Sequence, residues 1–170
     1  MRFTLCLVGT SVIAAPALAG DIAVRVEIPQ LSVAEYHRPY VAAWIEDANG
    51  KVVANLANWY DMKNRREDGA KWLPELRTWW RRSGRALNLP VDGVSGPTRA
   101  PGKYVLRFSE GTKPLPRLAG GKYVLRVEAA REVGGRELLS IPFNWSPAKT
   151  LTGTVRGKSE LGEVTLQIKP

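Results

Sequence analysis

The sequence predicts a mainly β fold, an immunoglobulin-like antiparallel β-sandwich with one inserted amphipathic helix. Three observations support this class. After residue 20, most of the chain consists of short segments in which apolar and polar residues alternate, separated by Gly, Pro, Asn and Asp. One stretch instead has apolar residues at helical spacing. Residues 20–170 are enough for a single β-sandwich domain with a real core, and too few to suggest two domains.

Alternation predicts the strands, and turn residues mark their ends. Between the second and third strands, Asn49-Gly50 favours the left-handed backbone of a hairpin turn. The segment GKYVLR occurs at 102–107 and again at 121–126, which indicates two strands of similar role, each introduced by a glycine turn. The predicted strands cover residues 22–28, 40–46, 51–56, 102–108, 121–127, 137–145, 151–156 and 163–168.

Residues 69–82 are predicted to be the inserted helix. Trp72, Leu73, Leu76, Trp79 and Trp80 recur at helical spacing, and a proline falls early enough for a first helical turn. Two interpretations remain open for this stripe. It covers one end of a sheet, or it forms an aromatic platform for a flat ligand or a docking partner.

The first 19 residues have the pattern of a signal peptide. Arg2 supplies a positive start, residues 3–15 are apolar and uncharged, and Ala17-Leu18-Ala19 is a small-x-small cleavage site. The apolar stretch is too short to cross a bilayer, which takes about 20 helical residues. We therefore expect a periplasmic protein, cleaved after Ala19, with no membrane span in the mature chain.

Composition narrows the classes of function. The only cysteine, Cys6, lies in the predicted leader, and the only histidine is His37. A mature chain without thiols forms no disulfide scaffold, thiol nucleophile or iron–sulfur cluster, so redox chemistry would need an organic cofactor. The net charge of +9 would suggest nucleic acid in a cytosolic protein, but that partner is mostly absent from the periplasm, and we expect no nucleic-acid binding.

Enzyme motifs are scarce in this sequence. It has neither a glycine-flanked serine nucleophile nor a phosphate-binding glycine loop, and we expect His37 at the surface or at a strand start. A hydrolase that uses His37 or two converging carboxylates is the third-ranked hypothesis. No metal site is predicted.

The segment from Leu89 to Gly102 is predicted to be a connecting loop, rich in Gly, Pro and small hydroxyl residues. In the purely structural interpretation, the segment is a connector whose Asp-Gly and Ser-Gly pairs make turns. A sharper interpretation comes from the order of its residues, which resembles the target motif of periplasmic FAD:protein FMN transferases. In that motif an Asp stands three residues before a Ser/Thr-Gly-Ala-Thr/Ser run. The matching residues here are Asp92, Ser95, Gly96 and Thr98.

This resemblance implies that Thr98 receives FMN through a phosphoester bond. Pro97 departs from the motif, which has alanine there, and proline restricts both its own backbone and that of Gly96. Arg99 and Lys103 are near enough in sequence to offset the charge of a phosphodiester.

Longer runs carry a second resemblance. They include Tyr36–Glu46, with Trp44 near its end, and further runs at residues 26–29, 58–61, 71–73, 79–84, 92–96 and 127–137. By these runs nearly all of the mature chain resembles a family of bacterial predicted periplasmic proteins, domain of unknown function 2271. The latter part is similar to an immunoglobulin-like module of flagellar hook-capping proteins. The family implies neighbouring FMN transferases and membrane proteins with PepSY-type domains, and hence extracytosolic electron transfer or iron handling.

Two hypotheses of function lead from this point. In the first, the protein is an electron-transfer module with FMN on Thr98, which works with a membrane PepSY-type partner. Trp59, Trp79 or Trp80 would then stack on the flavin ring. In the second, the protein has no cofactor and binds another envelope protein through the arginines of its helix, which are Arg77, Arg81 and Arg82.

Overall fold

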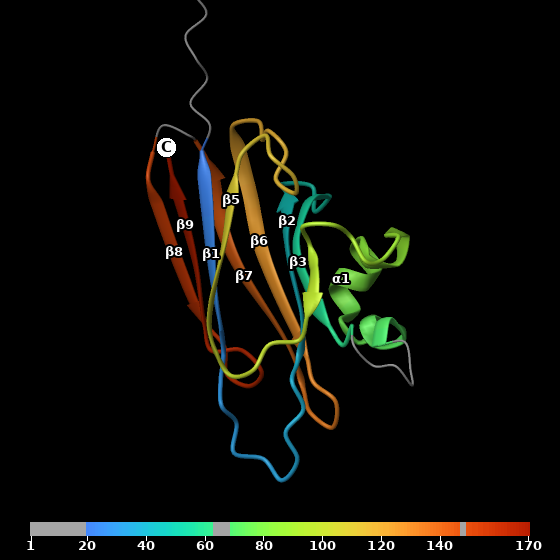
Figure 1. Cartoon of the computed structure of the whole chain (residues 1–170). Helices are drawn as coiled ribbons and strands as arrows, with labels where there is room; N and C mark the ends of the chain where they lie inside the picture. The colour runs from blue at the N-terminus through green and yellow to red at the C-terminus, as the bar shows by residue number, and fades with distance from the viewer. Residues whose placement is uncertain (1–19, 63–68, 147–148) are drawn as a thin grey trace, which may run out of the picture.

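The computed structural model describes residues 20–62, 69–146 and 149–170. Within them two β-sheets face each other, and a short helical segment lies on the outer side of the larger sheet (Figure 1). The predicted mainly β sandwich with a helical insertion is confirmed. The predicted leader lies outside the described residues.

The two sheets bring distant parts of the chain side by side. The smaller sheet has the order β5-β1-β9-β8 and the larger one the order β4-β3-β2-β6-β7. Neighbouring strands are antiparallel except β3 and β4, which are parallel. The strands are β1 (Asp21–Ile28), β2 (Tyr40–Asp47), β3 (Val52–Tyr60), β4 (Ser95–Pro97), β5 (Gly102–Ser109), β6 (Gly121–Ala130), β7 (Arg136–Trp145), β8 (Leu151–Arg156) and β9 (Glu163–Lys169).

Period-two alternation builds the main core between the sheets. On β1 the side chains of Ile22, Val24, Val26 and Ile28 are at most 1% exposed, while the residues between them face outward. Each such side chain contributes roughly 1.5–3 kcal/mol when it leaves water. The same alternation on β9 extends this apolar surface within the smaller sheet, and the buried residues of β6 lie on the facing surface of the larger sheet.

The single helix predicted over 69–82 is in fact two short helices, and a third short helix follows them. The 3₁₀-helix η1 (Gly69–Glu75) contains Pro74, the α-helix α1 spans Arg77–Arg82, and the 3₁₀-helix η2 spans Gly84–Ala86. Proline has no N–H for the α-helical ladder and disfavours a helical backbone at the residue before it, so the helix cannot run through this position.

The helical segment covers the outer face of the larger sheet and forms a second, smaller core there. Leu73, Leu76 and Trp79 are fully buried and lie against Trp44 of β2 and Tyr60 of β3. The covering interpretation is therefore confirmed for these three side chains. Trp72, placed in the same stripe by its spacing, is 51% exposed because the break in the helix turns it away from the sheet.

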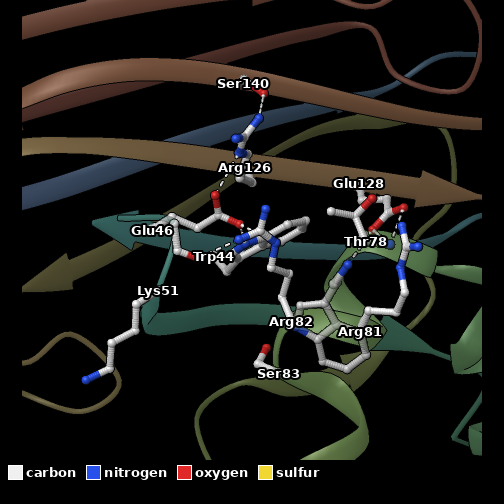
Figure 2. Close-up of polar contacts among 12 residues, drawn as sticks. Trp44, Glu46, Lys51, Thr78, Arg81, Arg82, Ser83, Arg126, Glu128 and Ser140 are labelled. Carbon is white, nitrogen blue, oxygen red and sulfur yellow. Dashed lines mark hydrogen bonds and ion pairs between the residues drawn. The ribbon is translucent and has the colours of Figure 1, made fainter. Parts of the chain in front are cut away.

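Two buried carboxylates hold the helical segment to the sheet (Figure 2). Glu128 of β6 is fully buried and accepts hydrogen bonds from the backbone N–H groups of Thr78 (3.1 Å) and Trp79 (2.8 Å), and from Arg136 Nη1 (2.8 Å). Glu46 of β2 lies between the guanidinium groups of Arg82 (3.7 Å) and Arg126 (3.2 Å). Burying these charges is tolerable only because each has such partners.

The repeated GKYVLR segments share a local device. In each, the tyrosine hydroxyl donates to the carbonyl of an alanine four residues earlier, Tyr104 to Ala100 (2.7 Å) and Tyr123 to Ala119 (2.9 Å). The glycine between them has a φ of 156° in the first copy and 155° in the second, a backbone that other residues rarely adopt. The repeated sequence therefore forms the same local structure at the start of both strands, although β5 lies at a sheet edge and β6 in a sheet interior.

Candidate functional site

The candidate site is the segment that leaves η2 and returns to the edge of the larger sheet. A tight turn precedes β4: the N–H groups of Val94 and Ser95 both bond to the Val91 carbonyl, at 3.2 and 2.8 Å. Gly93, at the centre of this turn, has a φ of 71°, which explains the Asp-Gly pair. The turn leaves Asp92 exposed.

The segment is an ordered edge strand over part of its length, which corrects the expectation of a connecting loop throughout. Ser95–Pro97 pairs in parallel with the end of β3, the short yellow-green arrow in Figure 1. The N–H of Asn58 bonds to Val94 (3.0 Å), and the N–H of Thr98 bonds to Tyr60 (3.1 Å). These bonds satisfy backbone groups that β3 would otherwise leave unpaired at the sheet edge.

The two hydroxyl groups of the motif have different surroundings. Ser95 Oγ accepts a hydrogen bond from the Val91 N–H at 2.8 Å, so it is part of the turn. The Thr98 hydroxyl takes part in no hydrogen bond with the residues that the structure describes, and the side chain is partly exposed. The structure thus places Asp92, Ser95, Gly96 and Thr98 in one short stretch, in which the Ser95 hydroxyl is hydrogen-bonded and the Thr98 hydroxyl, among the described residues, is not.

Arg99 brings a positive charge next to Thr98. Its guanidinium lies 5.3 Å from the Trp59 ring centroid and 5.7 Å from that of Tyr104, which are cation–π distances. Its Nε is buried and has no hydrogen-bond partner within the described ranges. Lys103, one strand further on, is exposed.

The aromatic residues expected to stack on a flavin are mostly out of reach. Trp59 is 3% exposed and belongs to the main core, and Trp79 of α1 is 0% exposed in the core between the helical segment and the larger sheet. Only Trp80 is partly exposed. This corrects the expectation for Trp59 and Trp79: both stabilise the fold, and neither presents a ring face to a ligand.

His37 lies at the surface, as expected. Its Nε2 is 3.0 Å from Glu35 and its Nδ1 is 3.5 Å from Glu132, both exposed carboxylates. Across the described ranges, no three His, Cys, Asp or Glu side chains gather in a way that could hold a metal ion. No helix in that part of the chain is long and apolar enough to cross a membrane.

Taken together, these features define a β-sandwich with a helical cover and an ordered, hydroxyl-bearing edge strand. The chain belongs to the family described as predicted periplasmic protein (DUF2271), whose model matches residues 21–163. No curated protein and no solved structure matches this sequence.

Proposed function

We propose that this protein is an exported carrier of covalent FMN, attached to Thr98, and that it transfers electrons with a membrane redox or iron-handling partner of the PepSY type. One observation carries the proposal: the motif lies at an exposed sheet edge, where the Ser95 hydroxyl is engaged and the Thr98 hydroxyl is not.

The attachment is a group transfer in which FAD is the donor. The Thr98 oxygen attacks the FMN phosphorus of FAD, the phosphoanhydride bond breaks, AMP leaves, and the hydroxyl proton is released. The product is a phosphodiester with one negative charge. The positive charge of Arg99, which follows Thr98 in the chain and is partly exposed, suits that charge and would hold the phosphate beside the sheet. The bound flavin supplies the redox chemistry, and the residues around it set its position and its electrostatic field.

The space around Gly96 supports the same proposal. A Cβ at this position would lie 3.5 Å from Trp59 Cδ1 and 3.9 Å from Arg99 Nη2, which are ordinary contacts. The fold therefore does not require glycine here. A transferase that must bring its active site against this backbone does gain from the missing side chain.

The test is co-expression with a FAD:protein FMN transferase, followed by intact-mass measurement and in-gel flavin fluorescence. We expect the wild-type protein to gain the mass of one phosphoester-linked FMN and Thr98→Ala to gain none. The matched control is Thr152→Ala, which removes an exposed hydroxyl on β8 and should be labelled like the wild type. An unlabelled wild-type protein beside a labelled positive substrate contradicts the proposal.

A second candidate function rests on the exposed arginines of the helical segment. Arg77 is 67% exposed, and Arg81 and Arg85 are exposed as well. They form a cationic face suited to an acidic envelope protein. Arg82 is different, because it bonds to the Gly50 carbonyl (2.6 Å) and lies beside Glu46. The test is therefore a pull-down with Arg77, Arg81 and Arg85 changed to Glu, and an unchanged yield would exclude this face.

A further inference from the structure

A pocket of about 580 Å³ lies between η1 and the turn that joins β6 to β7. Its apolar lining includes Trp72 of η1 and Val133 of the turn, and Tyr40 of β2 also lines it. Trp72 is 51% exposed and Val133 is 77% exposed, so two large apolar side chains are left in water around one hollow. Such a concave site with apolar walls and a few polar groups is typical of ligand-binding pockets.

The backbone at the rim of this pocket is strained. Val133 has a φ of 48°, and among the described non-glycine residues it is alone in having a positive φ. A β-branched residue in the left-handed region costs of order 1–3 kcal/mol, and such residues concentrate at functional sites. Nothing in the packing of an exposed turn requires valine there.

The pocket is also lined by three arginines, each in a different state. Arg136 is bound to the buried Glu128 (2.8 Å), and Arg77 is exposed on the rim. Arg131 is only 6% exposed and pairs with Glu160 (2.8 Å), yet its Nη1 is buried without a hydrogen-bond partner among the described residues. Two exposed carboxylates, Glu75 and Glu132, lie on the same rim. Arginine side chains and an exposed indole that line one pocket suit a planar ring that carries oxygen acceptors.

A continuous set of contacts links this pocket to Thr98. The Thr98 N–H bonds to the Tyr60 carbonyl (3.1 Å), and the Tyr60 ring lies 6.4 Å from the Tyr40 ring. Tyr40 lines the pocket, and its hydroxyl donates to the Gly69 carbonyl (3.0 Å) at the start of η1. Thr98 directly follows β4, Tyr60 ends β3 and Tyr40 begins β2, so the three residues lie on neighbouring strands at the same end of the sandwich (Figure 1). Strands are about 4.8 Å apart, so the pocket begins roughly 10 Å from Thr98.

We propose that this pocket receives the isoalloxazine ring of the FMN on Thr98, an inference that rests on the proposed function. The ribityl phosphate is the tether that crosses the end of β3, with its phosphate beside Arg99. Trp72 stacks on the ring, and the arginines face its carbonyl oxygens. Positive charge beside those oxygens favours electron uptake by the flavin.

The experiment uses the full chain, flavinylated by co-expression, with labelling checked by intact mass. Flavin fluorescence, visible circular dichroism and the midpoint potential are then compared in the wild type, Trp72→Ala, Trp72→Phe and Arg77→Gln. The control is Val105→Ala, which removes an apolar side chain on β5 that is 43% exposed. Both Trp72 and Arg77 are at least half exposed, so their variants keep the fold, which thermal unfolding checks.

We expect quenched flavin fluorescence in the wild type, a several-fold rise in Trp72→Ala, partial recovery of quenching in Trp72→Phe, and a lower midpoint potential in Arg77→Gln. Val105→Ala should match the wild type. A labelled wild type whose fluorescence equals that of Trp72→Ala overturns the pocket assignment and leaves attachment at Thr98 standing. A wild type that gains no mass overturns both proposals, so the two failures are distinct.

Discussion

Single carboxylates fix loops that apolar packing alone would leave loose. Glu137 of β7 accepts hydrogen bonds from four consecutive backbone N–H groups in the loop between β8 and β9, those of residues 158–161, at 2.6–3.2 Å. Burial alone would raise the pKa of this carboxyl, but the four bonds to its charged form outweigh burial and hold the pKa below its ordinary value of 4.5. One side chain thus joins a strand of the larger sheet to a loop of the smaller sheet.

This depressed pKa predicts a specific loss of stability in acid. A carboxyl whose pKa is lower in the folded state stabilises the fold above its unfolded pKa, and the stabilisation disappears as pH falls from about 4.5 through the folded value. Glu137→Gln should lose about 1–2 kcal/mol at pH 7, since the group is partly solvated. Urea unfolding at several pH values measures this, and wild type and variant should converge in acid. A constant difference between them at every pH would refute the assignment.

At the scale of the element, the helical segment depends on Glu128 as much as on its apolar residues. α1 has only six residues and no side-chain cap at its N-terminus, so alone it would not persist in water. The Glu128 carboxylate bonds to the N–H groups of Thr78 and Trp79 in its first turn and supplies the missing partner from the sheet.

Removing this charge should therefore detach the cover. We expect Glu128→Gln to destabilise the protein by about 3–5 kcal/mol, because it leaves Arg136 and two N–H groups poorly paired. Glu75→Gln is the matched control: Glu75 is 59% exposed and 3.9 Å from Arg77, so its loss should cost at most about 1 kcal/mol. Denaturant unfolding followed by tryptophan fluorescence reports both effects. Equal losses in the two variants would mean that the buried carboxylate does not anchor the segment.

The free edge of β4 has few backbone N–H groups with which another strand could pair. Its Ser95 N–H already bonds to Val91, and Pro97 has no N–H, so the strand offers few donors to a new neighbour. Pro97, the departure from the flavinylation motif, thus has a structural use at this edge.

Two substitutions in β4 separate its structural role from its proposed chemical one. Gly96→Ala should leave the free energy of unfolding within about 0.5–1 kcal/mol of wild type, because a methyl group there makes only ordinary contacts. It should lower FMN incorporation, because the added side chain would obstruct the approach of the transferase. Pro97→Ala restores the motif and should raise the rate of incorporation. Labelling time courses followed by intact mass measure both rates. Unchanged labelling in Gly96→Ala would show that the transferase tolerates a side chain there.

Over the whole molecule, alternation predicted which residues form strands but not how the strands pair. The predicted strand at residues 22–28 matches β1, since its four buried residues alternate strictly. Strand order depends on contacts between remote segments, which no local pattern records. β4 escaped prediction because three residues that include Gly and Pro carry no strand signal.

The sequence motif identified the residues of the candidate site, but it did not predict which of their side chains are hydrogen-bonded. The order of Asp92, Ser95 and Thr98 was visible, whereas only the fold shows that Ser95 closes a turn. Glu46 and Glu128 occupy outward positions in the alternation, so they suggest a solvated face. The helical cover buries that face, and such a cover cannot be placed from spacing alone. Pro74 interrupts the helix that the spacing suggested, and this was the sequence signal that Trp72 would not lie on the buried face with the other apolar residues.

The central place of β9 gives a prediction for the whole molecule. β9 pairs with both β1 and β8, and its Val164, Leu166 and Ile168 are at most 1% exposed in the main core. A chain that ends at residue 162 should fail to fold, while a chain that lacks only Pro170 should fold normally. Size-exclusion chromatography and circular dichroism distinguish the two. A folded, monomeric truncation would show that the larger sheet is stable alone.

The pairing of β1 with β9 also sets the order in which the fold is completed. β1, the first described strand, can pair fully only after β9, the last one, is present, since Asp21 lies opposite Lys169 and Val26 opposite Val164. A chain that emerges from its amino end, whether from a ribosome or through a membrane channel, cannot close the smaller sheet until β9 has appeared. Until then β1 has β5 on one side and an open edge on the other. Folding of this sandwich is therefore a late event that follows delivery of β9.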